Sequence, residues 1–346
     1  MNHRLPAEWE SQDGVLLAWP HERSDWAPYL HEVEETYVEL VCTITRFEKA
    51  VVIAPEQKSP YIRSRLKKAG VREENLILVE IPTNDTWARD FGFITVIDKQ
   101  GRRKLLDFGF NGWGLKFPAF LDNQINRRLF HSFLFKKGVS LKTIGMILEG
   151  GSIESDGEGT ILTTSTCLLS PNRNPHLSRG EIERALKRYV GARRVLWLNH
   201  GYLAGDDTDS HIDTLARFAN PTTILYVQCT NREDEHYKEL CAMEEELRSF
   251  RTTKNKPYTL VPLPMPHPYY DKSNNRLPAT YANFLIINQA VIVPTYDDPH
   301  NDPIALETFR KVFPSREIIP IPALTLIRQH GSIHCITMQI PQGVLA

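Results

Sequence analysis

Short apolar runs alternate with amphipathic stretches along most of the chain. Apolar positions recur every three or four residues in 25–47, which predicts a helix, and the apolar runs at 50–54 and 76–81 predict buried strands. Between these strands, the polar segment 59–68 predicts a second helix that ends at Gly70. This succession continues toward the C-terminus, so the pattern predicts an α/β fold.

The same patterns predict the remaining elements. Strands are expected at 93–97, 105–113, 146–153, 161–164, 194–199, 223–228, 258–263, 281–288, 290–294 and 317–321. Helices are expected at 120–135, 179–189, 232–250 and 303–313, and Ser178-Arg179-Gly180-Glu181 forms a capping box at the start of the second of these. No break in composition marks a linker, so we expect residues 1–346 to form one domain.

The segment that follows the acidic stretch 205–213 fits a strand at least as well as a helix. Ile212, Thr214, Ala216 and Phe218 alternate with the residues between them, which is a period of two. On a strand, the side chains of His211 and Asp213 would lie side by side on one face.

Polar or glycine-bearing motifs flank short strands near Asp90, Glu149, His211, Asp297 and Cys335. Their spacing of roughly 40 to 85 residues indicates a weak internal repeat of strand-strand-helix-strand units around a central site.

Composition narrows the classes of partner. Charged residues make up 24% of the chain and the formal net charge is -1, so we expect neither nucleic acid nor a membrane surface as a partner. No apolar stretch resembles a signal peptide or a membrane span, and the five cysteines show no C-x-x-C or zinc-type spacing. We therefore expect a cytoplasmic protein with reduced thiols.

One cysteine stands in a context suited to chemistry. Cys335 follows Gly331-Ser332-Ile333-His334 where a loop meets a strand, whereas the other cysteines lie in apolar patterns typical of a core. A free thiol with a pKa of about 8.5 needs a neighbouring base or cation to become a nucleophile. His211 and His334 are candidates, and we favour His211 because on a strand His334 would point to the face opposite Cys335.

The acidic residues need a separate explanation. Asp90 and Asp213 would oppose a thiolate by charge repulsion unless a cation lies between them, and a guanidinium matches carboxylates in shape and charge. The competing explanation is a magnesium or manganese site built from His211-Ile212-Asp213 and the acidic residues Asp206, Asp207 and Asp209. Such a site would leave Cys335 without a role.

Four motifs, taken in order, carry a resemblance over nearly the whole chain. They are Asn84-Asp85-x-Trp87-x-Arg89-Asp90-x-Gly92, Glu149-Gly150-Gly151 with Asp156-Gly157-x-Gly159-Thr160, His211-Ile212-Asp213, and Ile333-His334-Cys335-Ile336-Thr337. The chain resembles the agmatine deiminase and bacterial-type peptidylarginine deiminase family of the guanidino-group-modifying superfamily. The resemblance implies a five-bladed pseudo-symmetric α/β propeller, the pentein fold, and implies no metal and no organic cofactor.

The resemblance also implies roles for individual residues. It makes Cys335 the nucleophile, His211 the general acid and base, and Asp90 and Asp213 the carboxylates that hold a guanidinium. It assigns substrate binding to Trp87, Glu149 and Asp85.

The implied reaction converts a guanidino group to a ureido group and ammonia through a covalent thiouronium, with agmatine to N-carbamoylputrescine, a step toward putrescine and the polyamines, as the leading case. Deimination of free or peptidyl arginine, amidino transfer, and guanidino binding without catalysis stay open. The chain departs from the family pattern at Ser210 and at Gln329-His330-Gly331-Ser332, which leaves the tail of the small cationic substrate open. A homo-oligomer is compatible with the sequence.

Overall fold

The computed structural model describes residues 3–132 and 134–346, and it confirms the α/β class. Two four-stranded sheets lie among the described residues. The first contains β17 (Thr337–Pro341), β2 (Gln12–Ala18), β3 (Lys49–Ala54) and β4 (Leu76–Glu80) in that order. The second contains β1 (His3–Arg4), β5 (Ile94–Asp98), β6 (Arg103–Gly109) and β7 (Ser140–Ile147).

Three further sheets of three strands occupy the rest of the described chain. One contains β8 (Ile153–Ser155), β9 (Thr160–Thr164) and β10 (Arg194–Leu198). The next contains β11 (Ala216–Asn220), β12 (Thr223–Gln228) and β13 (Thr259–Pro264), and the last contains β14 (Leu285–Ile287), β15 (Ala290–Thr295) and β16 (Glu317–Pro322).

All five sheets share one unit, in which an antiparallel pair is followed by a parallel strand. The antiparallel pairs are β17 with β2, β5 with β6, β8 with β9, β11 with β12 and β14 with β15. The parallel strands that follow are β3, β7, β10, β13 and β16. A parallel partner needs a long crossover, and a helix lies in each of the five crossovers. The strand-strand-helix-strand unit inferred from motif spacing is therefore present.

The crossover helices are α1 (Leu30–Thr45), α5 (Ile125–Phe130), α7 (Arg179–Tyr189), α8 (Tyr237–Ser249) and α9 (Asn301–Val312), and α2 (Ser59–Lys68) joins β3 to β4. Shorter helices are α3 (Ala88–Phe91), α4 (Gly112–Leu115), α6 (Ser165–Leu168) and α10 (Leu324–Ile327). Single 3-10 turns are η1 (Ala27–Tyr29), η2 (Glu73–Asn75), η3 (Asp122–Gln124), η4 (Gly150–Ser152) and η5 (Ile212–Thr214). No helix of the described residues is both long enough and apolar enough to cross a membrane.

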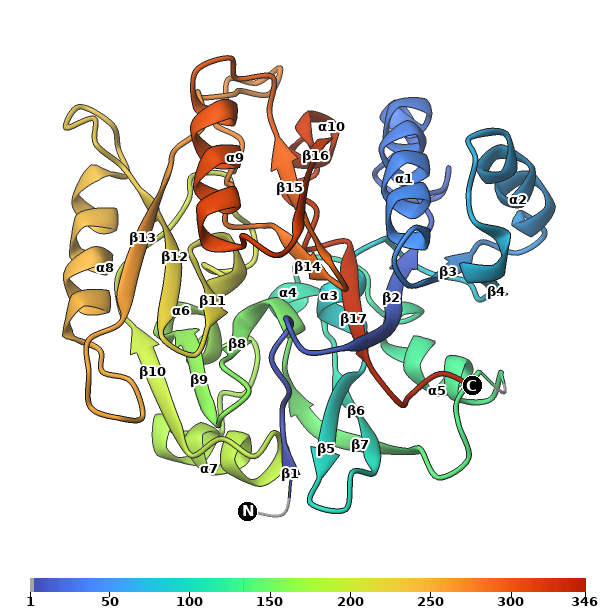
Figure 1. The fold of residues 1–346 in the computed structure, drawn as a ribbon, viewed down its shortest axis with the longest axis horizontal. Coiled ribbons are helices and arrows are strands. Elements are labelled where there is room, and N and C mark those ends of the chain that lie inside the picture. Colours follow the sequence, from blue (N-terminus) through green and yellow to red (C-terminus); the bar gives the residue numbers. More distant parts are fainter. Residues whose placement is uncertain (1–2, 133) are drawn as a thin grey trace.

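The long helices α1, α8 and α9 lie at the periphery, whereas α3 and the end of β17 lie near the middle of the view (Figure 1). The C-terminal strand β17 pairs antiparallel with the N-terminal strand β2, with Thr337 opposite Leu17. This pairing places the segment before Thr337, which contains Cys335, against the first unit of the chain.

Several predicted elements differ from the structure, and the strand expected at 281–288, for example, is shortened to β14. The helix expected at 120–135 is reduced to η3 and α5, and residue 133 lies outside the described residues. The main-chain N–H of Leu121 is satisfied by the side chain of Asn84, and Asp122 accepts from the Asn84 N–H, so loop contacts replace the first helical turn. The strand expected at 105–113 ends at Gly109. The capping box is confirmed, with Ser178 N–H donating to Glu181.

Candidate active site

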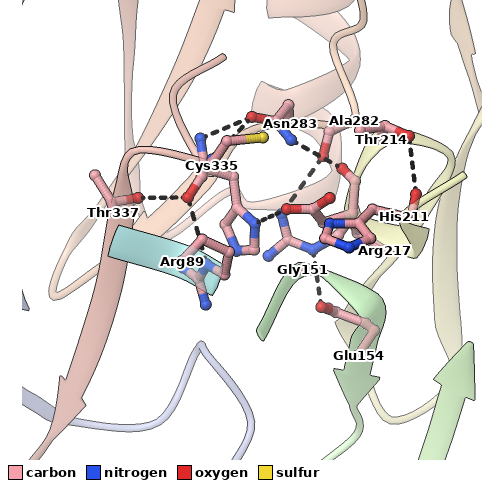
Figure 2. Close-up of polar contacts among 12 residues, drawn as sticks. Arg89, Gly151, Glu154, His211, Thr214, Arg217, Ala282, Asn283, Cys335 and Thr337 are labelled. Carbon is pink, nitrogen blue, oxygen red and sulfur yellow. Dashed lines mark hydrogen bonds and ion pairs between the residues drawn. The ribbon is translucent and has the colours of Figure 1, made fainter. Parts of the chain in front are cut away.

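The turn 333–336 holds Cys335 just before β17, as expected for a thiol where a loop meets a strand. The side chain of Asn283 accepts from the main-chain N–H groups of His334 at 2.9 Å and Cys335 at 3.2 Å. The main-chain N–H of Arg89, in α3, donates to the carbonyl of Cys335. Figure 2 shows Asn283 bonded to the N–H of Cys335, and Arg89 and Thr337 bonded to the preceding carbonyl, that of His334. The thiol is therefore held on a rigid turn and is 6% exposed.

The strand predicted around His334 and Cys335 is wrong, because both residues lie in the turn and β17 begins only at Thr337. The ring of His334 contacts Asp213 through Nδ1 and Glu8 through Nε2. His334 is thus engaged on both ring nitrogens, which supports the choice of His211 as the base for a reason other than strand alternation.

His211, Asp90 and Asp213 converge on Gly151. A Cβ atom built on Gly151 would lie 2.6 Å from His211 Nδ1, 2.9 Å from Asp90 Oδ1 and 3.1 Å from Asp213 Oδ2. The Gly151 N–H donates to Asp90 Oδ1 at 3.0 Å. The paired glycines therefore allow the backbone to lie close to these three side chains. The local structure is the 3-10 turn η4 and not a β-bulge.

The strand expected through His211 and Asp213 is absent. Residues 212–214 form η5, and β11 starts at Ala216. The N–H and hydroxyl of Thr214 both donate to the carbonyl of His211, which closes a turn that the period of two could not reveal. The two side chains still reach the same site through this turn.

Burial sets the protonation of the site. It lowers the pKa of His211 to about 3, although Asp213 opposes the shift. Burial raises the pKa of the Cys335 thiol well above its usual value, and Asp213 and Asp90 raise it further because a thiolate would be repelled by their charges. Burial and the Asp213 charge likewise raise the pKa of Asp90. The free protein therefore pairs a neutral thiol with a neutral imidazole at neutral pH.

Two polar atoms of the site are buried without a hydrogen-bond partner among the described residues. They are Nε2 of His211 and Oδ1 of Asp213. Such atoms are costly unless they serve a ligand or a reaction. They are an acceptor or donor nitrogen and a carboxylate oxygen, which suits binding of a cation beside a proton-transfer group.

Aromatic and acidic side chains line the pocket that contains Cys335 and Asp90. The aromatic side chains are Trp87, Trp113 and Phe117, and the acidic ones are Asp25, Asp85 and Asp207. Gln329 and His330, where the chain departs from the family pattern, also line it. The indole N–H of Trp113 donates to Asp90 Oδ2 at 2.8 Å and fixes the second oxygen of that carboxylate.

Asp85 and Trp87, for which substrate binding is expected, line the wall of this pocket. Asp85 accepts from the indole N–H of Trp26 at 3.0 Å and from the N–H of Thr86, and burial raises its pKa to about 6. The Trp87 ring lies between those of Trp26 and Trp113. Asp85 therefore both shapes the loop and faces the pocket.

Glu149 is held by a cation that the sequence did not indicate. Arg173 donates through Nε to both oxygens of Glu149 at 2.8 and 3.0 Å, and through Nη1 to Asp209 at 2.5 Å. Glu149, Cys167 and His211 each offer an atom within 4.8 Å of the others, a donor set that could hold a metal ion. The Arg173 guanidinium, bound to both carboxylate oxygens, disfavours a second cation there.

The acidic stretch proposed as an alternative metal site is used for structure. Asp206 accepts from the N–H groups of Thr208 and Ser210, and Asp209 pairs with Lys116 as well as Arg173. Their oxygens cap a loop and bind cationic side chains.

A family model described as Porphyromonas-type peptidyl-arginine deiminase matches residues 4–341. The chain belongs to this family. It is 34% identical to an agmatine deiminase of Pseudomonas aeruginosa (strain LESB58), over 98% of this chain and 95% of that protein. Its structure is similar to that of the agmatine deiminase of C. jejuni, solved as a cysteine-to-serine variant with substrate bound, with a TM-score of 0.90, 43% identity and coverage of 99% and 97%.

A second solved structure is similar over the same extent. It is a Porphyromonas gingivalis protein whose assignment as an arginine deiminase is provisional, with a TM-score of 0.92, 50% identity and coverage of 99% of this chain and all of that one. The family fold therefore spans the whole described chain.

Sequence reasoning on this family member missed several residues that build the site. Asn283 fixes the thiol segment, Trp113 and Arg173 bind Asp90 and Glu149, and Arg217 forms a buried ion pair with Glu154 at 2.9 Å. A lone asparagine or arginine outside a motif carries no local signal. Trp113 had one, since it stands in the run Gly112-Trp113-Gly114, which is typical of a turn.

Proposed function

We propose that the chain is a cysteine-dependent deiminase that hydrolyses a guanidino group to a ureido group and ammonia, with agmatine to N-carbamoylputrescine as its reaction. The observation that carries this proposal is a pocket lined by the Cys335 thiol and Asp90, where Asp90 meets Asp213 and the His211 imidazole, which has an unpaired nitrogen, at Gly151. Agmatine deiminases at 33–34% identity over almost the full chain support it.

The substrate cation itself activates the nucleophile in this proposal. Asp90 and Asp213 hold the guanidinium, and its positive charge cancels the repulsion by which the two carboxylates raise the pKa of the thiol. Cys335 then passes its proton to His211 and attacks the guanidinium carbon. The proton held on His211 goes to the departing ammonia, which leaves a thiouronium on sulfur.

Hydrolysis completes the cycle. His211 is neutral again after ammonia leaves, because burial disfavours its protonated form, and the free ring nitrogen can accept a proton from water. Water adds to the thiouronium carbon, the C–S bond breaks, and the thiol regains its proton as the ureido product leaves. Glu149, tied to Arg173, has a carboxylate oxygen within 4.8 Å of a ring nitrogen of His211.

The acidic lining of the pocket supports a substrate with a second positive charge. Asp25, Asp85 and Asp207 line it, and the described lining residues include no lysine or arginine. The ammonium of agmatine would be attracted to these carboxylates, whereas the carboxylate of free arginine would be repelled and would find no cationic partner among them.

The five units support a finer statement of the fold. We infer that they close into a pseudo-symmetric five-bladed propeller of one domain, because β17 joins the last unit to the first and each sheet repeats the same pairing. The site lies where segments of all parts of the chain meet. The cytoplasmic location, the absence of a cofactor and the state of oligomerisation stay predictions.

An ammonia-release assay with agmatine, free arginine and an arginine-containing peptide, side by side, tests the proposal. We expect ammonia and the ureido product from agmatine at a kcat/KM far above the other two. Equal or greater turnover of arginine or the peptide would overturn the assignment of the tail, and binding of agmatine without ammonia would overturn the deiminase. A new guanidino compound formed when an acceptor amine is added would identify amidino transfer.

A further inference from the structure

The ring of His334 lies between two buried carboxylates. Its Nδ1 is 2.7 Å from Asp213 Oδ2 and its Nε2 is 2.7 Å from Glu8 Oε2. The exposed fractions of the three side chains are 2%, 0% and 4%. This histidine has no role in the mechanism above. It contacts Oδ2 of Asp213, whereas Oδ1 of the same carboxylate has no hydrogen-bond partner among the described residues.

The two contacts require two protons. At 2.7 Å a nitrogen and an oxygen lone pair repel unless a hydrogen lies between them. A neutral imidazole carries one N–H, so either the ring is an imidazolium between two carboxylates, or one carboxyl group is protonated.

The surroundings place both protons on the ring. Glu8 also accepts from Arg217 at 2.9 Å, and Arg89 lies 3.6 Å from it. Burial alone would raise the pKa of Glu8, but Arg217, His334 and Arg89 hold it well below its usual range. Burial would also raise the pKa of Asp213, yet its contacts with His334, together with His211 and Arg217, lower it.

Burial, Arg217 and Arg89 hold the pKa of the His334 ring below its ordinary value, and Glu8 and Asp213 offset only part of that shift. The 2.7 Å contacts decide between these opposing influences, because two ionised carboxylates leave only the ring to supply both hydrogens. The charged and titratable groups around the ring are Asp213, Glu8, Arg217, Arg89, Glu154 and Cys335.

We propose that His334 is a permanently protonated positioning residue, an imidazolium that holds Asp213 Oδ2 so that Oδ1 faces the substrate cation. Asp213 is then fixed by His334 on one oxygen, much as Asp90 is fixed by the indole of Trp113. The Glu8 carboxylate and the Arg217 guanidinium extend this support to the N-terminal segment and to β11. The orienting role rests on the proposed function, whereas the protonation of the ring does not.

The chain contains a matched control. His236 is 1% exposed, and its Nδ1 lies 2.6 Å from Asp234 Oδ1. Its Nε2, however, accepts from the N–H of Ala204 at 2.8 Å, so this nitrogen carries no hydrogen. A buried histidine with one carboxylate is therefore neutral here, and one with two carboxylates is not.

Imidazole 15N NMR of the ligand-free protein at a pH of about 7.5, one unit above the ordinary histidine pKa of about 6.5, tests the protonation state. We expect two N–H resonances for the ring of His334 and one, at Nδ1, for that of His236. In Glu8→Gln, whose amide can donate to Nε2, His334 should lose one of its two N–H signals. A neutral His334 in the wild-type protein would overturn the proposal.

Binding of agmatine to the Cys335→Ser protein tests the positioning role. Adding His334→Gln should weaken binding by about 10²-fold, the scale of loss for a misplaced binding group. Adding His236→Gln should leave it unchanged. Unaltered binding in a folded His334→Gln protein would refute the positioning role.

These outcomes separate the inference from the proposed function. If wild-type protein bound agmatine but released no ammonia, the deiminase would fail while both tests of His334 could still be read. If agmatine did not bind at all, the positioning role would fail with the proposed function, and the NMR result alone would stand.

Discussion

Replacing Asp90 by asparagine tests the claim that this site recognises charge. The side chain keeps its shape, and the carboxamide oxygen can still accept from the indole of Trp113 or from the N–H of Gly151. What is lost is one of the two negative charges that face the guanidinium. Asp90→Asn should therefore weaken binding of agmatine and spare ligands that are neutral at the reacting end.

The size of the loss follows from the geometry. Asp90 is 4% exposed, so water does not screen its interaction with a bound cation. A hydrogen bond to a charged group contributes about 1.5–3 kcal/mol. At about 1.4 kcal/mol for each tenfold change in affinity, one such bond corresponds to a loss of about 10- to 150-fold for agmatine.

Calorimetric titration in the Cys335→Ser background, where turnover is blocked, measures this loss for agmatine and for its neutral ureido counterpart, N-carbamoylputrescine. We expect the affinity for the ureido compound to change by less than about threefold, since its reacting end lacks the charge that Asp90 holds. Asp107→Asn is the matched control, because Asp107 is 2% exposed and bonded to Asn126 and Thr143 instead.

Equal weakening of both ligands would show that Asp90→Asn distorts the pocket, and no weakening of agmatine would show that the carboxylate does not hold the guanidinium. Either result would refute the charge argument.

Three further predictions concern the nucleophile, metal and pH. Cys335→Ser should lower turnover by at least about 10³-fold, as other nucleophile deletions do, and near-normal turnover would exclude this thiol as the nucleophile. Dialysis against a strong chelator should leave activity unchanged; a loss restored by manganese would point to the Glu149, Cys167 and His211 group. Burial raises the pKa of Asp90 in the folded state, so its ionisation costs stability as pH rises above the unfolded value of about 3.9. The thermal midpoint of Asp90→Asn should therefore rise relative to that of the wild type as the pH increases above about 4, and a difference that stays constant with pH would contradict this reasoning.

The repeat was visible in the sequence because each unit combines buried strands with an amphipathic helix, and both leave strong periodic signals. The turn at His211 was not visible in the sequence. Thr214 donates to the His211 carbonyl and so forms η5, but the apolar residues of this segment alternate as they would in a strand. The length predicted for the helix near Asp122 was wrong for a related reason, since Asn84, in a distant loop, accepts from the N–H of Leu121.

Asp90, His211 and Asp213 meet at Gly151, and Cys335 lines the same pocket as Asp90, but the residues that hold them were hidden. Asn283, Arg173 and Arg217 act only through partners more than 20 positions away in sequence. Nothing in their neighbours marks them, because their importance depends on the tertiary fold. His334 shows the same limit: the motif Ile333-His334-Cys335 drew attention to the ring, and only the contacts with Asp213 and Glu8 indicate its charge.

Rapid acid quenching during agmatine turnover, followed by mass spectrometry of the proteolytic fragments, tests whether Cys335 carries a covalent intermediate. We expect an amidino group on the fragment that contains Cys335, formed and lost at rates that match the release of ammonia. Ammonia release without any such adduct, or an adduct on Cys167 instead, would contradict it.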